Sequence, residues 1–223
     1  MRKLTLLLAI ATFAIPSFGQ GLTVTLNQTT AGAPTTQQIM QLTPTRGHFD
    51  VPGLGQVFYN TETKIMRVIP AVMKAYMEYT PDSVQKAVAA GRGAPPPQKT
   101  TYRKTGTRKV KEWPCTTYEG VRGTEKIVEI CVAAGAEIAL TTADFKIVQE
   151  AIDLGKQFTQ QDTIESIPIY GTVDKQGFAG FPVRRITFKN GQTEKTTELV
   201  EFKREAIPAA ALEVPTGYPK VGQ

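Results

Sequence analysis

Apolar and polar residues alternate along much of the chain beyond residue 20. The clearest case is Leu22-Thr23-Val24-Thr25-Leu26, in which every second side chain is apolar. This period of two predicts a strand with one buried face and one polar face. Strand-like runs also predict strands at residues 37–42, 57–60, 64–69, 74–79, 109–113, 116–120, 126–133, 183–189 and 193–203.

The predicted strands follow one another closely along the chain. Asn190-Gly191 separates the last two, and this dipeptide is the strongest short-range signal for a hairpin. Parallel neighbours need crossover connections of a dozen residues or more, whereas antiparallel neighbours need only a tight turn. We therefore expect an antiparallel meander of short strands.

A short helix is predicted after residue 80. Thr80 is suited to cap it, and Pro81 fits the first helical position, where the N–H that proline lacks would have no partner in any case. Glycines and prolines then fill residues 91–97, so this segment is expected to end in a loop.

A longer helix is predicted from about residue 141 to residue 160. Its apolar residues cover half of the helical wheel: Phe145, Ile147, Val148, Ala151, Ile152, Leu154 and Phe158. This arc is wider than the usual stripe of a surface helix and fits a helix lying in a concave sheet. Packing on a flat sheet fits the pattern equally well. We expect one α+β domain over residues 20–223.

The first residues have the pattern of a secretory signal peptide. Arg2 and Lys3 precede an apolar run over residues 4–15, and Ser17 and Gly19 are the small residues before the expected cleavage point. The run is shorter than the roughly 20 residues of a membrane-spanning helix. We therefore expect residues 1–19 to be removed and the protein to be periplasmic, without a lipid anchor.

The charge of the chain is mildly basic. Removal of Arg2 and Lys3 would lower the formal net charge from +6 by two, to +4. A local basic run contains Arg103, Lys104, Arg108, Lys109 and Lys111. It is interpreted as a solvated strand edge, where lysine discourages pairing between copies. Contact with anionic headgroups of a membrane surface is the alternative, and nucleic acid is not an expected partner.

The two cysteines, Cys115 and Cys131, are expected to form a disulfide. An exported protein meets an oxidising compartment, and the two residues lie on predicted strands that neighbour each other along the chain. Their spacing matches neither a redox motif nor a zinc site. Two separate buried thiols are the alternative.

The chain is short of catalytic side chains. Its only histidine, His48, lies among Arg46, Gly47 and Asp50 in a stretch that suggests an exposed turn. Histidine and cysteine together number three, which is the least that a zinc site requires. No nucleophile elbow, calcium loop or glycine-rich phosphate loop is present. We expect no catalytic residues, no metal, no cofactor and no enzymatic activity.

Several motifs resemble a bacterial exported family, domain of unknown function 4412. They are Met66–Pro70, Lys74–Met77, Trp113–Tyr118, Phe181–Val183 and the closing segment Val214–Val221. That family resembles in turn the LolA/LolB-type lipoprotein carriers. The resemblance implies a curved antiparallel β half-barrel with helices on its concave face. It also implies a cavity that takes acyl chains between sheet and helix.

Two functional hypotheses follow. In the first, the protein binds or carries a lipid or a lipoprotein acyl chain, and Phe145, Val148, Ile152 and Phe158 contact the ligand. The segment over residues 80–97 would then serve as a lid over the open end. In the second, the protein is a ligand-free envelope module that acts through contacts with other proteins.

Overall fold

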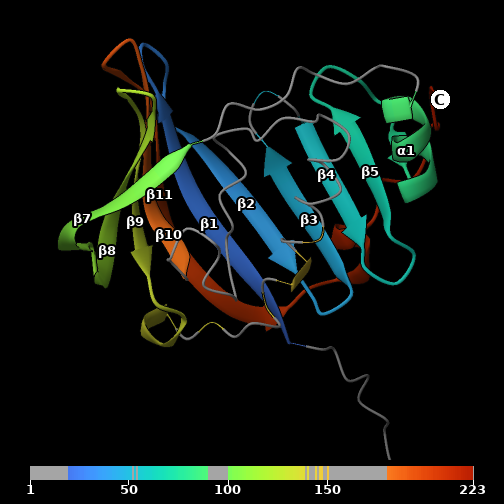
Figure 1. Ribbon diagram of the computed structural model, residues 1–223. Helices are drawn as coiled ribbons and strands as arrows, with labels where there is room; N and C mark the ends of the chain where they lie inside the picture. The colour runs from blue at the N-terminus through green and yellow to red at the C-terminus, as the bar shows by residue number, and fades with distance from the viewer. Residues whose placement is uncertain are drawn as a thin grey trace, which may run out of the picture.

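One antiparallel sheet contains every strand of the described chain (Figure 1). The structure is a computed structural model, and it describes residues 20–51, 53, 55–89, 100–138, 140, 144, 146–147, 150 and 180–222. The strands are β1 (Gln20–Thr30), β2 (Thr36–Leu42), β3 (Arg46–Val51), β4 (Gly55–Asn60), β5 (Ile65–Pro70), β6 (Met77–Tyr79), β7 (Thr101–Val110), β8 (Trp113–Arg122), β9 (Glu125–Ala133), β10 (Phe181–Lys189) and β11 (Gln192–Ala206). They are accompanied by α1 (Pro81–Ala89) and two 3₁₀ turns, η1 (Gly135–Ile138) and η2 (Ala209–Leu212).

The sheet is open. Its strand order is β6-β5-β4-β3-β2-β1-β11-β10-β9-β8-β7, and every neighbouring pair is antiparallel. All neighbours are also consecutive in sequence except β1 and β11, which join the first and last strands at the centre. The prediction of an antiparallel sheet is confirmed.

Two local sequence signals are confirmed in detail. Asn190 and Gly191 have φ values of 52° and 76° and connect β10 to β11, as the hairpin prediction requires. At α1, the backbone N–H of Ser83 donates to Thr80 Oγ1 over 3.2 Å, and the backbone N–H of Thr80 donates to Ser83 Oγ over 2.9 Å. These reciprocal bonds satisfy donors that a helix start leaves without partners.

Three strand predictions were wrong in position. The strand predicted at 109–113 is interrupted by a turn at Lys111, whose φ is 52°, so that β7 ends before it and β8 begins after it. The strand predicted at 74–79 is confined to residues 77–79. The stretch around His48, interpreted as a turn, is β3, because Gly47, Phe49 and Val51 alternate with polar residues.

The sheet is strongly curved (Figure 1). The turn between β7 and β8 reaches β11, which lies four strands away from β7 in the sheet. There the Lys111 ammonium donates to the carbonyl oxygen of Leu199 over 2.9 Å, and Trp113 meets Phe202 edge-on at 6.3 Å between ring centroids. These contacts place the main apolar cluster on the concave side.

The C-terminal segment crosses the opposite, convex side. Beyond β11, η2 contacts β2 and β3. The segment ends beside β6, where the N–H of Tyr76 donates to the carbonyl of Pro219 and the N–H of Val221 donates to the carbonyl of Tyr76, over 3.0 and 2.8 Å. We call residues 207–222 the C-terminal strap; it includes the closing segment of the family motifs.

Parts of the sequence-based prediction lie outside the described residues. They are the signal peptide at 1–19, the glycine- and proline-rich stretch at 91–97, and most of the helix predicted at 141–160. The placement of that helix on the concave face therefore stays a prediction. Among the residues that are described, no helix is long and apolar enough to cross a membrane.

Candidate functional site on the concave face

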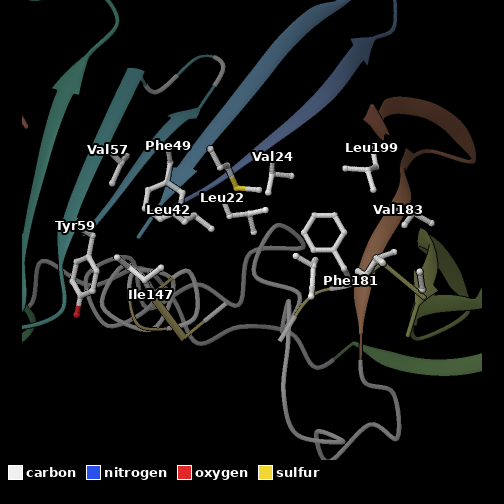
Figure 2. Close-up of a cluster of buried hydrophobic side chains, with 14 of the residues drawn as sticks. Leu22, Val24, Leu42, Phe49, Val57, Tyr59, Ile147, Phe181, Val183 and Leu199 are labelled. Atoms are coloured by element: carbon white, nitrogen blue, oxygen red, sulfur yellow. The ribbon is translucent and has the colours of Figure 1, made fainter. Parts of the chain in front are cut away.

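The concave face is a continuous apolar surface that runs across the sheet (Figure 2). Because side chains alternate between the two faces of a strand, each strand contributes every second residue to it. The strand residues buried in this cluster are Leu22, Val24, Met40, Leu42, Phe49, Val57, Tyr59, Met66, Val68, Val110, Trp113, Cys115, Cys131, Ala133, Phe181, Val183 and Leu199. Such a surface can hold an apolar partner but offers no catalytic group.

Aromatic side chains line the more tightly curved part of this face. Phe202 packs edge-on against Trp113 at 6.3 Å and against Phe181 at 5.1 Å between ring centroids. Both distances lie in the range favoured by aromatic pairs. Trp113 is the only tryptophan of the chain, so its fluorescence reports on this part of the face.

A segment after η1 covers part of the apolar face. Asp144, Lys146, Ile147 and Glu150 are its described residues, and all four have a helical backbone. Ile147 is 1% exposed and belongs to the concave cluster. Figure 2 shows it beneath the strands, between Tyr59 and the other labelled side chains. We call residues 144–150 the cover segment.

Polar contacts fasten the first residue of the cover segment. The Arg204 guanidinium on β11 donates two hydrogen bonds to the two carboxylate oxygens of Asp144, over 2.9 and 2.7 Å. The hydrogen bond to Asp144 is the main reason that the pKa of Arg204 is raised. A bidentate pair of this kind fixes orientation as well as distance.

Further contacts fasten the other end of the cover segment, beside β4 and β5. Lys64 Nζ lies 2.6 Å from Glu150 Oε2, and the Tyr59 hydroxyl donates to the same oxygen over 3.4 Å. Within the segment, Lys146 Nζ lies 3.9 Å from Glu150 Oε1. The cover segment thus has an apolar centre and an ion pair at each end.

The four residues predicted to contact a ligand, Phe145, Val148, Ile152 and Phe158, all lie outside the described residues. Their role stays a prediction. Ile147 belongs to the same predicted apolar arc but was not among the chosen four. The breadth of the arc was the signal that could have selected it.

The cysteines form a disulfide within the concave cluster. Cys115 on β8 and Cys131 on β9 are joined, with their Cα atoms 5.4 Å apart. Cys131 Sγ also lies 3.4 Å from Thr117 Oγ1, the residue opposite it in the register of the two strands. The bond ties together two strands of the strongly curved part of the sheet.

His48 lies on the convex side, so it is not part of the concave site. Its side chain is only 15% exposed, which corrects the expectation of an exposed turn residue. The imidazole stacks on Phe58 with 4.5 Å between centroids. Burial lowers the pKa of His48, against the opposing influence of Asp50 and of a hydrogen bond with the Ala211 backbone. Neutral imidazole is therefore the favoured form.

A small cavity lies between the convex face and the C-terminal strap. Its volume is about 80 Å³, and its lining includes Arg46, Phe58, Arg67, Leu212 and Glu213. A water molecule occupies about 30 Å³ in the liquid, so this cavity suits a few waters and is too small for an acyl chain. No group of three or more metal-binding side chains occurs among the described residues.

Comparison with solved structures identifies proteins of similar fold. An uncharacterized conserved protein from Thermus thermophilus is 12% identical; the match covers 91% of this chain and 90% of that one, with a TM-score of 0.50. This likeness concerns the fold alone.

Two further matches have lower TM-scores. MucB in the MucA/MucB complex of Pseudomonas aeruginosa is 9% identical over 88% of this chain, which spans 58% of that protein, with a TM-score of 0.36. A LolA superfamily protein from Nitrosomonas europaea is 8% identical over 89% of this chain and 91% of its own, with a TM-score of 0.26.

No curated protein sequence matches the chain. A family model does, over residues 45–218, which include β3 to β11 and most of the C-terminal strap. The resemblance inferred from the sequence motifs is thereby confirmed. Because the match extends over most of its length, the chain belongs to the family described as Domain of unknown function (DUF4412).

Proposed function

We propose that this protein binds the acyl chain of a lipid or lipoprotein against its concave face, beneath the cover segment. The observation that carries the proposal is the construction of that segment. Ile147 is 1% exposed in the apolar cluster, while Asp144 and Glu150 hold the segment through polar contacts with neighbouring elements. An apolar seat with polar fastenings can be opened and reclosed without exposing the rest of the core.

The energies involved are compatible with exchange between the cover segment and a ligand. The cations of the two fastening pairs, Arg204 and Lys64, are 40% and 49% exposed, and surface pairs contribute about 0–1 kcal/mol each. Burial of a methylene group contributes about 0.8 kcal/mol. A few buried methylenes of an acyl chain therefore offset the loss of both pairs.

The proposal includes the location of the protein. The basic start and apolar run of residues 1–19 support export and removal of that segment. A periplasmic protein with an apolar ligand site would meet lipids and lipoproteins at the membranes that bound its compartment. No catalytic group is part of this proposal, and the expectation that the protein is not an enzyme is retained.

A second candidate function is a ligand-free module that acts through protein contacts. The complete burial of Ile147 favours it, since a side chain packed to 1% exposure leaves no space of its own for a ligand. Under this alternative, the concave cluster is only the hydrophobic core, and the cover segment stays closed.

Quenching of Trp113 distinguishes the two candidates. Bromine atoms quench indole fluorescence only at short range, so a brominated fatty acid reports its arrival beside Trp113. We expect saturable quenching below the concentration at which the fatty acid forms micelles. Absence of saturable quenching, together with absence of lipid in native mass spectra of the exported protein, would overturn the acyl-chain proposal and leave the ligand-free module.

Variants of the fastening pairs test the role of the cover segment. Asp144→Asn and Glu150→Gln keep the size of each side chain and remove its charge. Together they should raise fatty-acid affinity by about fivefold for each pair that had to open. Glu213→Gln is the matched control, because it removes an ion pair with Arg46 at the convex strap. An equal effect in the control would show that the cover segment is not the gate.

A further inference from the structure

The two edges of the sheet differ in their surroundings. The β6 edge is occupied by the C-terminal strap, through the bridge between Tyr76 and Lys220 and an ion pair of 3.0 Å between Lys220 and Glu78. The other edge is β7, which runs for ten residues, all exposed except Tyr102 and Val110. β7 is therefore the more accessible edge of the described sheet.

β7 and the turn after it carry five cations in nine residues, and β7 itself contains no acidic residue. Three of these cations have partners within the protein. Arg103 lies 2.8 Å from Glu119, Arg108 lies 2.5 Å from Glu129, and Lys111 donates to a backbone carbonyl on β11. Their charges are wholly or partly engaged by the fold.

Lys104 and Lys109 remain without an ion-pair partner in the part of the chain that the structure describes, and both are exposed. They share one face of the strand, because the bulge after Lys104 restores the parity that five positions would otherwise break. Lys104 lies opposite Tyr118 and Lys109 opposite Pro114. Four strand positions separate these two partners, which corresponds to about 13 Å.

The direction of these side chains decides the kind of partner. Side chains stand roughly perpendicular to a sheet, so both lysines project from its face, away from the concave cluster. An added strand would pair with β7 in the plane of the sheet, whereas a surface lying against that face would meet both ammonium groups at once. Lysines at an edge also discourage pairing between copies of the chain.

We propose that this face of β7 is a docking surface for an anionic phospholipid membrane, with Lys104 and Lys109 as its headgroup contacts. The inference rests on the proposed acyl-chain function, since it gives the carrier a way to approach the source of its ligand. Two lysines produce weak, reversible attachment, with about fivefold in affinity contributed by each. Weak attachment suits a protein that has to leave the membrane again.

Vesicle co-sedimentation tests this surface. The wild-type protein should sediment with vesicles of equal parts phosphatidylglycerol and phosphatidylcholine, should stay in solution with phosphatidylcholine alone, and should lose binding as salt is added. The double variant Lys104→Gln/Lys109→Gln should bind the anionic vesicles about 25-fold more weakly. The control Lys86→Gln/Lys189→Gln removes two exposed lysines from α1 and from the end of β10.

The outcomes separate this inference from the proposed function. Equal losses in the test and control variants would mean a general charge effect and would overturn the docking surface. So would wild-type protein that binds polyglutamate but no anionic vesicle, because the partner would then be an acidic protein. Quenching of Trp113 by monomeric brominated fatty acid, measured without vesicles, should be the same in all variants. Loss of that quenching in the wild type would instead contradict the acyl-chain proposal.

Discussion

Lys111 donates a hydrogen bond to the carbonyl oxygen of Leu199, 2.9 Å away and 88 residues later in the chain. The two residues belong to the β7–β8 turn and to β11, so the bond crosses the concave side. That carbonyl lies at the bulge where the register of β1 and β11 shifts between Thr25 and Leu26. One surface cation thereby links the curvature of the sheet to an irregularity at its centre.

Replacing Lys111 with methionine should loosen the curve. Lys111→Met keeps the apolar stem and removes the ammonium, which also lies 6.0 Å from the centre of the Trp113 ring. Because Lys111 is 37% exposed, we expect a loss of about 1 kcal/mol of unfolding free energy. Urea unfolding checks this, with a red shift of Trp113 emission as the local signal. Lys109→Met is the control and should change neither; a Lys111 variant as stable as this control would contradict the prediction.

Reduction of the disulfide should destabilise the protein without unfolding it at room temperature. Cys115 and Cys131 are separated by 16 residues, and closing a loop of that size restricts the unfolded chain by about 3 kcal/mol. The melting temperature should therefore fall on addition of reductant. The variant Cys115→Ala/Cys131→Ala serves as control, because its melting temperature should not respond to reductant. Two alkylatable thiols in unreduced exported protein would show that the bond is absent in the cell.

The accuracy of the sequence-based strand predictions depended on the residues at each turn. Asn190-Gly191 gave its hairpin away because both residues readily adopt positive φ. The turn at Lys111 could not be recognised in the same way, since a lysine followed by a glutamate is a common surface pair. β3 was hidden because one of its inward positions is Gly47, which removed an apolar residue from the alternation.

The candidate site was predicted less completely than the sheet. The breadth of the apolar arc pointed correctly to a buried face around Ile147. The fastening contacts could not be predicted, because Asp144 and Arg204 are 60 residues apart and neither belongs to a motif. The convex strap was equally hidden: its closing segment was recognisable as a family motif, but its position beside β6 depends on pairing across the whole fold.

The C-terminal strap should contribute to stability through Leu212. This side chain is 6% exposed and lines the cavity of about 80 Å³ on the convex side. Leu212→Ala would enlarge that cavity, and buried leucine-to-alanine changes cost about 2–5 kcal/mol. We expect the low end of that range, because the cavity already opens to solvent. Val72→Ala, at a residue that is 93% exposed, is the control and should change the urea midpoint little. A Leu212 variant with the same midpoint as this control would mean that the strap is only loosely packed.

His48 should make stability depend on pH in mildly acidic solution. Burial lowers its pKa below the ordinary value of 6.5, so the unfolded chain binds a proton before the folded protein does. Stability is then full above pH 6.5 and falls as the pH decreases from that value through the folded pKa of His48.

The contribution of His48 can be separated from that of the acidic residues. The pKa of Glu119 is lowered from 4.5, chiefly by the hydrogen bond from Arg103, so its stabilising effect is lost only as the pH falls below that range. Urea midpoints measured between pH 7.5 and pH 5, a window set by the ordinary histidine pKa of about 6.5, should decline in the wild type. In His48→Phe, which keeps an aromatic ring over Phe58, the midpoint should stay level across the same window. A parallel decline in both proteins would assign the effect to other groups and would show that His48 is protonated as easily in the fold as in the unfolded chain.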